Sequence, residues 1–173
     1  MRGDRGGICH QVLAESGYDR PGAVIVGTDS HTTTHGAFGA FAFGVGATEM
    51  AVVWALGKVL NVEVPATIKV VVRGALPAGV QAKDLILHLI GLIGAEGANF
   101  KVLEFHGGAI SRLSMSGRLV LSNMAVEAGA TAGIIPADAE TARDLGEEAG
   151  VTGDIPSVLP DTEVNSAAMK STG

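Results

Sequence analysis

The sequence predicts an α/β domain of three α/β/α layers with a mostly parallel sheet. Short apolar or β-branched runs of strand length alternate with longer runs of helical periodicity, and turn residues separate them. Hydrophobic residues make up 47% of the 173 residues but aromatic ones only 4%, so small aliphatic side chains must build the core. This length suits a single domain. We assign residues 1–150 to that domain and residues 151–173, which lack periodicity, to a linker or irregular tail.

The first elements lead into one polar stretch. Residues 9–16 predict a short helix ended by Gly17, and residues 18–22 contain a Pro-Gly turn. The small apolar residues 23–27 then predict a buried strand that ends directly before Thr28. In parallel sheets, this carboxyl end of a strand is where ligands usually bind.

A glycine-rich run follows the polar stretch. Residues 36–46 interleave glycine with phenylalanine, which permits close approach of the backbone to a ligand or, in close packing, to another element. Thr48 is a candidate cap for a helix over 49–59. The β-branched residues 67–74 predict a strand.

The second half alternates helices and strands. Helices are expected over 84–93 and 116–128, and strands over 102–105 and 132–135. Residues 138–149 predict an acidic, exposed helix.

Composition narrows the classes of function. A net charge of −6 without a basic patch argues against nucleic acid as a partner. The most apolar helical stretch, 85–93, is about nine residues, far short of the roughly 20 that cross a membrane. No apolar segment follows the charged residues at the N-terminus, and the single cysteine, Cys9, excludes an internal disulfide. We therefore expect a cytoplasmic protein without a membrane or nucleic-acid partner.

The polar stretch 27–36 reads Gly-Thr-Asp-Ser-His-Thr-Thr-Thr-His-Gly. Asp29 and His31 at the end of a strand suit substrate orientation and proton exchange, because histidine titrates near neutrality. Alternatively, Asp29 and Ser30 cap the next element and His31 is merely exposed. Both interpretations stay open from the residues alone.

Other patterns carry less information. Cys9-His10, and His31 with His35, lack the CxxC or HExxH spacing of a zinc site. No Gly-x-Ser-x-Gly elbow or complete phosphate loop is present, which disfavours a serine hydrolase and a nucleotide site. Glu127 lies in a run almost free of charge, as a site group or a paired structural carboxylate. His88 and His106 are interpreted as structural histidines.

Four segments together resemble the aconitase superfamily: residues 7–11 (Gly-Ile-Cys-His-Gln), 27–32, 35–46 and 122–130. The resemblance covers roughly residues 7–142, and the wording of 32–44 is most similar to the large subunits of 3-isopropylmalate dehydratases and homoaconitases. It implies the iron-sulfur domain type of fold. It also implies a hydro-lyase that moves a hydroxyl between neighbouring carbons of a hydroxy di- or tricarboxylic acid, most closely 3-isopropylmalate to 2-isopropylmalate in leucine biosynthesis. A homoaconitase or aconitase type of hydratase is the alternative.

The resemblance also implies roles for individual residues. His10 and Asp29 match a pair beside the substrate, and Ser30 matches a contact to a substrate carboxylate. His31 matches the histidine bonded to iron-bound hydroxyl, and Glu127 the acid near the open iron. Asp29 and His31 also count as substrate-binding positions, and Asn123 matches a polar neighbour of the cluster.

The family's 4Fe-4S cluster is held by three cysteines in a later segment, whereas this sequence contains only Cys9. We therefore expect no metal ligand among these residues, no cluster held by this chain alone, and as partners the remaining large-subunit segments and a small subunit. Two other interpretations stay open. One is a non-catalytic binding or assembly module, and the other a mononuclear-metal hydro-lyase that uses His10, His31 and Glu127.

Overall fold

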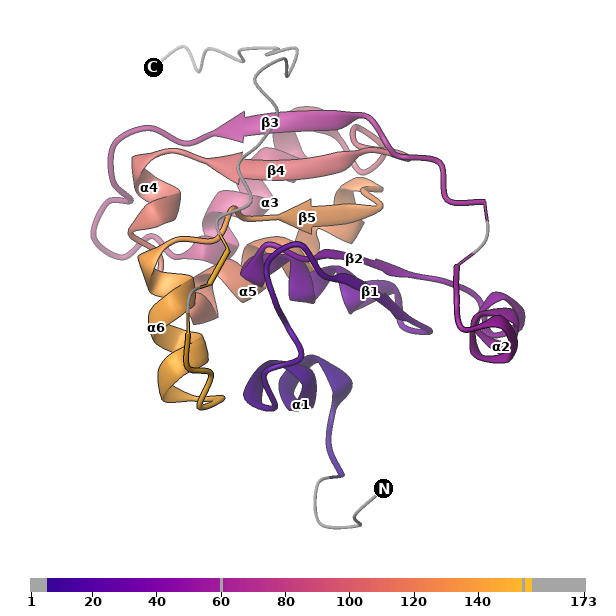
Figure 1. Ribbon diagram of the computed structural model, residues 1–173. Helices are drawn as coiled ribbons and strands as arrows, with labels where there is room; N and C mark the ends of the chain where they lie inside the picture. Colours follow the sequence, from indigo (N-terminus) through magenta and orange to yellow (C-terminus); the bar gives the residue numbers. More distant parts are fainter. Residues whose placement is uncertain (1–5, 60, 154, 157–173) are drawn as a thin grey trace.

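The computed structural model describes residues 6–59, 61–153 and 155–156, so most of the predicted tail, 151–173, lies outside the described residues. Helices and strands alternate along the chain (Figure 1). The elements are α1 (Cys9–Glu15), β1 (Val24–Gly27), the 3₁₀ helix η1 (Ser30–Phe38), β2 (Phe41–Gly44), α2 (Ala47–Leu56), β3 (Thr67–Val71), α3 (Ala82–Ile93), β4 (Val102–His106), α4 (Gly108–Ser111), α5 (Met115–Met124), the 3₁₀ helix η2 (Ala125–Ala128), β5 (Ala132–Ile134) and α6 (Ala139–Glu147).

All strand pairs are parallel, which confirms the predicted α/β class with a mostly parallel arrangement. Within the described residues the strands form two sheets rather than one: β1 pairs with β2, and β4 lies between β3 and β5. The junction between the sheets is made by η1. The amide of Ile135, just after β5, donates to the carbonyl oxygen of Gly36 in η1 at 3.0 Å. The polar stretch therefore lies where the two sheets meet.

Glycine makes this junction possible. A Cβ atom on Gly36 would lie 1.9 Å from the carbonyl oxygen of Gly133, and one on Gly44 would lie 2.7 Å from the carbonyl oxygen of Asp29. Both distances are shorter than any real Cβ contact. Of the two interpretations of the glycine-phenylalanine run, close packing of backbone on backbone describes these positions.

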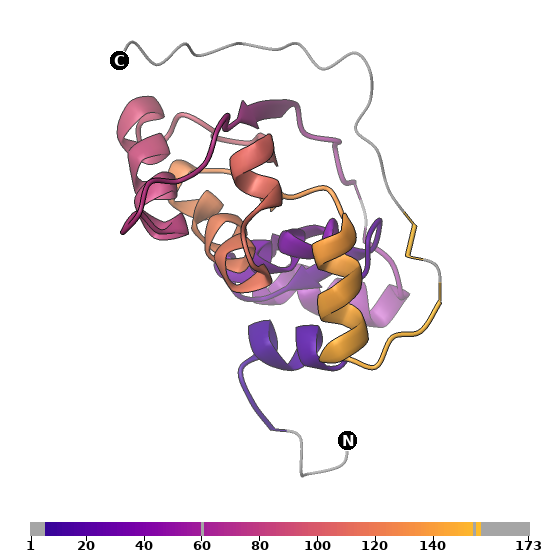
Figure 2. The same cartoon turned by 90° about the vertical axis from the view of Figure 1, so that its left-hand side faces the viewer.

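The main core lies between the larger sheet and the helices α3 and α5, which cover the same face of it (Figure 2). Leu103 and Phe105 of β4 meet Ile86 of α3 and Leu121 of α5 there. A second cluster joins η1, α5 and α6, and Leu145 is the residue that α6 contributes to it. The prediction of α6 as an exposed helix is therefore wrong for one of its faces.

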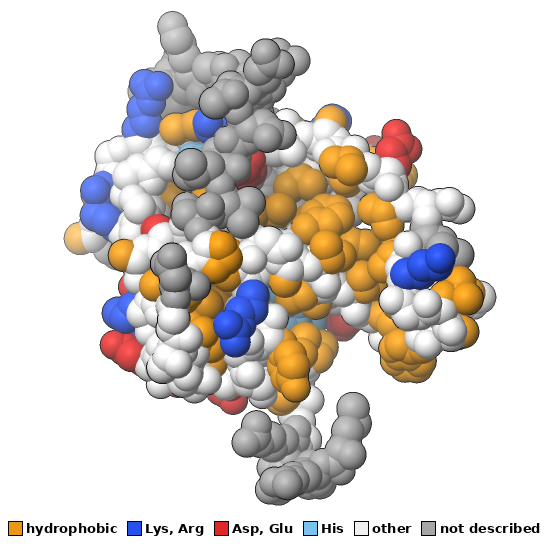
Figure 3. All heavy atoms as spheres, viewed as in Figure 1, with side chains coloured by type: hydrophobic (Ala, Val, Ile, Leu, Met, Phe, Trp, Pro, Cys, Tyr) orange, Lys and Arg blue, Asp and Glu red, His pale blue; other side chains and the backbone are white. Residues whose placement is uncertain are grey.

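Two predicted elements differ in detail. The strand β1 is not buried, because β2 is its single strand neighbour among the described residues, and Val24 is 63% exposed. Helix α2 begins at Ala47 after an N-cap at Gly46, not at Thr48. Its apolar side chains gather at the surface (Figure 3), where Trp54 is 80% exposed.

Local signals also missed three elements and one break. The 3₁₀ helix η1, the strand β2 and the short helix α4 were not predicted. The strand β2 lies within the glycine-phenylalanine run, which shows neither strand nor helix periodicity. The helix expected over 116–128 is divided into α5 and η2, and Gly129 ends η2 with a φ of 80°. In the described part of the chain no helix has the length and apolar character needed to cross a membrane.

Candidate functional site

The geometry of the polar stretch begins with Asp29, which caps η1. Its Oδ1 accepts from the backbone N–H of His31 at 2.7 Å, and its carbonyl oxygen accepts from the Thr32 hydroxyl at 2.6 Å. The Thr34 hydroxyl donates to the carbonyl oxygen of His31 at 2.6 Å. Asp29 is therefore a capping residue, as one interpretation expected, and the cap fixes the backbone that presents His31.

Asp29 does more than cap η1, because it also lies in a row of candidate residues in the order His10, Asp29, His31 and Glu127, with Ser30 beside His31. The Nε2 atom of His10, from α1, lies 3.3 Å from Asp29 Oδ1. The Nε2 atom of His31 lies 3.3 Å from Oε1 of Glu127 in η2, a residue 96 positions away. Ser30 Oγ lies 3.3 Å from His31 Nδ1. The structure therefore brings His10, Asp29, Ser30, His31 and Glu127 together.

The row alternates acids with imidazoles and is open to solvent. The side chains of Asp29 and Glu127 are each 54% exposed, that of His31 37% and that of His10 21%. The hydrogen bond from the His31 amide lowers the pKa of Asp29; partial burial opposes this, and the nearby His10 and His31 lower the pKa further. Asp29 is therefore a carboxylate at neutral pH, able to hold an imidazolium.

Within the described part of the chain, Asn123 makes no hydrogen bond to the row itself but hydrogen-bonds to η1, which carries Ser30 and His31. Its side-chain amide donates to the Thr34 hydroxyl at 2.8 Å, and its backbone carbonyl accepts from the Thr33 hydroxyl at 3.2 Å. Two hydrogen bonds therefore tie α5 to η1. Because η2 continues directly from α5, the same bonds help set where Glu127 lies.

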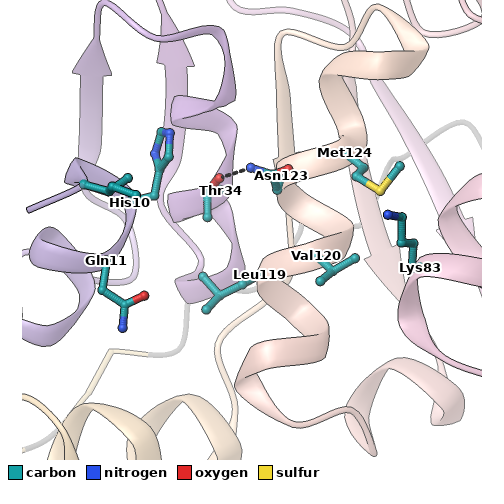
Figure 4. A pocket seen from close by; sticks show the side chains of 9 residues that line it. His10, Gln11, Thr34, Lys83, Leu119, Val120, Asn123 and Met124 are labelled. Atoms are coloured by element: carbon teal, nitrogen blue, oxygen red, sulfur yellow. Dashed lines mark hydrogen bonds between the residues drawn. The ribbon is translucent and has the colours of Figure 1, made fainter.

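Two cavities border the row. One, with a volume of about 370 Å³, combines polar groups with an apolar wall (Figure 4). Its lining residues are Ile8, His10, Gln11, Thr34, Lys83, Leu119, Val120, Asn123 and Met124. The second, of about 420 Å³, is lined by Ser30 together with the backbone of Gly44 and Gly46. His10 and Ser30 thus line different cavities, although His10 contacts Asp29, the residue next to Ser30 in the chain.

These residues do not fit an iron-sulfur cluster as its holders. Such clusters are bound by several cysteine thiolates, and the sequence contains one cysteine. Cys9 is exposed, with its Sγ 3.6 Å from His10 Nδ1. Within the described ranges no three His, Cys, Asp or Glu side chains converge as metal ligands. The mononuclear interpretation with His10, His31 and Glu127 therefore lacks its ligand set.

Sequence reasoning missed a buried pair beside the row. His35 Nδ1 lies 2.7 Å from Asp19 Oδ2, and the two side chains are 1% and 0% exposed. No local pattern links positions 16 apart, and His35 was considered only as a zinc ligand. A second missed pair, Arg118 with Asp138, is structural. His106 pairs with Glu104 at 3.1 Å, as a structural histidine does.

Comparison with known proteins gives this geometry a context. The aconitase family (aconitate hydratase) matches residues 2–150. The chain is 52% identical over 149 residues to 3-isopropylmalate dehydratase large subunit 1 of Methanopyrus kandleri, covering 86% of this chain and 35% of that protein. It is 55% identical over 141 residues to the 3-isopropylmalate dehydratase large subunit of Elusimicrobium minutum, covering 82% and 33%.

A third relative carries a different name. The probable methanogen homoaconitase large subunit of Methanosarcina mazei is 56% identical over 135 residues, which cover 78% of this chain and 34% of that protein. The chain therefore spans about a third of the length of the curated relatives it matches. The match over residues 2–150 shows that this chain belongs to the aconitase family.

Proposed function

We propose that this chain forms part of the large subunit of a hydro-lyase of the 3-isopropylmalate dehydratase type. The enzyme would isomerise a hydroxy di- or tricarboxylic acid by removing water and adding it back, in leucine biosynthesis. Family membership and the names of the relatives support the reaction class. The observation that carries the proposal is the contact of His31 with Glu127, made across 96 residues and beside the His10–Asp29 pair.

Loss of a hydroxyl group needs a proton donor, because hydroxide is a poor leaving group. His31 is suited to this, since its Nδ1 side faces Asp29 and Ser30 while its Nε2 lies against Glu127. A carboxylate next to an imidazole stabilises the protonated ring and fixes its orientation. In this proposal Glu127 orients His31 and exchanges its proton, and the exposed Ser30 hydroxyl binds a substrate carboxylate.

His10 supplies the second proton-carrying group. Asp29 remains ionised at neutral pH and holds the Nε2 atom of His10 at 3.3 Å, so the ring faces the row in one orientation. We propose that the 4Fe-4S cluster of the complete enzyme, the remaining large-subunit segments and a small subunit come from outside these residues. The exposed thiol of Cys9 fits a reducing compartment, which we propose to be the cytoplasm.

A chimera tests this proposal. Residues 2–150 of this chain replace the matching part of the Methanopyrus kandleri large subunit, which is produced anaerobically with its small subunit. We expect hydration activity, and 3-isopropylmalate should be a better substrate than the homoaconitase substrate. Glu127→Gln and His31→Asn should each lower kcat about a hundredfold or more, within the range for general acid-base groups.

Two exposed residues provide matched controls: Glu96→Gln and His88→Asn make the same chemical changes away from the row. They should leave kcat unchanged. Full activity of the Glu127 and His31 variants would refute the roles proposed for those residues. A folded, cluster-loaded chimera without activity would instead favour the non-catalytic binding or assembly module.

A further inference from the structure

We propose that the buried pair of Asp19 and His35 is a positioning device that holds the His10 ring against Asp29. The proton-transfer role of His10 rests on the proposed function, whereas its orientation by this pair does not. Neither Asp19 nor His35 belongs to the row described above. The argument rests on how α1, which carries His10, is attached to the rest of the domain.

Helix α1 has few attachments of its own. It has seven residues, none of them buried, and among the described residues no side chain caps its N-terminus. Its contacts are made mainly with η1. A helix this short has little intrinsic stability. The orientation of His10 must therefore come from the groups that its end and its ring contact.

Asp19 secures the end of this helix. The helix closes with a hydrogen bond from the Tyr18 amide to the Leu13 carbonyl, and Gly17 adopts a φ of 70° there. Asp19 follows directly and is completely buried, with Oδ2 2.7 Å from His35 Nδ1 in η1. One buried hydrogen bond therefore ties the exit of α1 to the 3₁₀ helix that presents His31.

His35 also contacts His10 itself. The two rings are tilted by 48° with their centroids 5.8 Å apart. The His10 ring meets His35 as well as the Asp29 carboxylate, which lies 3.3 Å from its Nε2 atom. The Asp19 bond fixes the rotation of the His35 ring, and that ring limits the rotation of His10. The Asp19–His35 pair thus fixes both the position of the C-terminal end of α1 and the orientation of the His10 ring.

The chemistry of the pair favours positioning over stabilisation. Asp19 Oδ1 is buried without a hydrogen-bond partner among the described residues. An incompletely satisfied buried carboxylate is costly, and apolar residues of similar volume stabilise such a site equally well or better. What apolar residues cannot supply is a ring held at a fixed angle by a hydrogen bond.

Nitrogen-15 NMR of the imidazoles in the complete 173-residue chain tests the proposal without any activity measurement. At a pH high enough to deprotonate the imidazolium form, wild-type His10 should show a single tautomer with its proton on Nε2, facing Asp29. His35→Gln keeps a donor for Asp19 but removes the ring, and it should replace this signature by a mixture of tautomers. Asp19→Asn keeps an acceptor for His35 and should retain the signature, as should the control His88→Gln at an exposed position of α3.

Thermal unfolding separates orientation from general loss of structure. If His35→Gln fails to fold, the double variant Asp19→Leu/His35→Leu, which removes both partners, decides in the same way. A folded variant without the His35 ring that keeps the single Nε2–H tautomer of His10 overturns the proposal. In the active chimera, His35→Gln should lower kcat about ten- to a hundredfold with little change in KM, as expected for a misplaced group. Failure of the chimera alone would count against the proposed function and leave the NMR result standing.

Discussion

Gly36→Ala is the sharpest test of how the two sheets are joined. The new Cβ would lie 1.9 Å from the carbonyl oxygen of Gly133 and 2.9 Å from its carbonyl carbon, so backbone must move. Such overpacking costs up to about 3 kcal/mol. Separation would also weaken the hydrogen bond from Ile135 to Gly36, which is worth about 1 kcal/mol. We expect a loss of about 3 kcal/mol in the free energy of unfolding, which lowers Tm by about 6–12 °C.

Urea and thermal unfolding followed by circular dichroism measure this loss. Gly91→Ala is the matched control, because nothing lies within 4 Å of a Cβ built at that position in α3. Alanine in a helix interior should raise stability there by about 0.5–1 kcal/mol. If Gly36→Ala is as stable as the control, the backbone contact between η1 and β5 is not what joins the sheets.

Four further predictions concern the polar pairs. Arg118→Met should lower the free energy of unfolding by about 3 kcal/mol in urea titrations, because the fully buried guanidinium holds Asp138 through bonds of 2.7 and 2.8 Å. Burial raises the pKa of Asp138, but the hydrogen bond and charge of Arg118 outweigh burial, so the pKa is lowered. The resulting stabilisation is complete above the usual aspartate pKa and is lost as the pH falls through the lower pKa of the folded state. The Tm of the wild type should therefore fall more steeply below about pH 4 than the Tm of Arg118→Met. Carbon-13 NMR should give Asp29 a carboxyl pKa below the unperturbed value of 3.8. Thr34→Val should lower the free energy of unfolding by about 1 kcal/mol, since the Thr34 hydroxyl bridges η1 to Asn123.

Periodicity predicted the elements that pack on the main core and failed where other forces set the backbone. Each of these elements buries one face, so its side chains follow the expected spacing; they are the helix over 84–93 and the strands over 67–74 and 102–105. In η1, the hydroxyls of Thr32 and Thr34 bond back to the main chain. Such bonds compete with α-helical ones, and the result is a 3₁₀ helix that no apolar pattern announces.

The candidate site shows a similar division. The end of β1 placed Asp29 and His31 together from local sequence alone. Local sequence drew attention to His10 and Glu127, but only the family resemblance placed them beside Asp29 and His31, because spacing does not encode an approach across 96 residues. Neither local sequence nor the family resemblance predicted the buried Asp19–His35 pair, since the contact depends on the path of the chain between α1 and η1.

Asp29 shows why a structural and a catalytic interpretation of one residue need not compete. As an N-cap, Asp29 accepts a hydrogen bond from the His31 amide on its Oδ1 at 2.7 Å, and this bond is the leading cause of its lowered pKa. The same oxygen lies 3.3 Å from His10 Nε2. The cap thus favours the charged form of the same carboxylate that faces the imidazole of His10. Replacing Asp29 by asparagine should keep much of the cap, since asparagine caps helices comparably, yet remove the charge that His10 faces. In the chimera, stability should change by less than about 1 kcal/mol while kcat falls; equal losses of folding and activity would show that Asp29 acts as a cap alone.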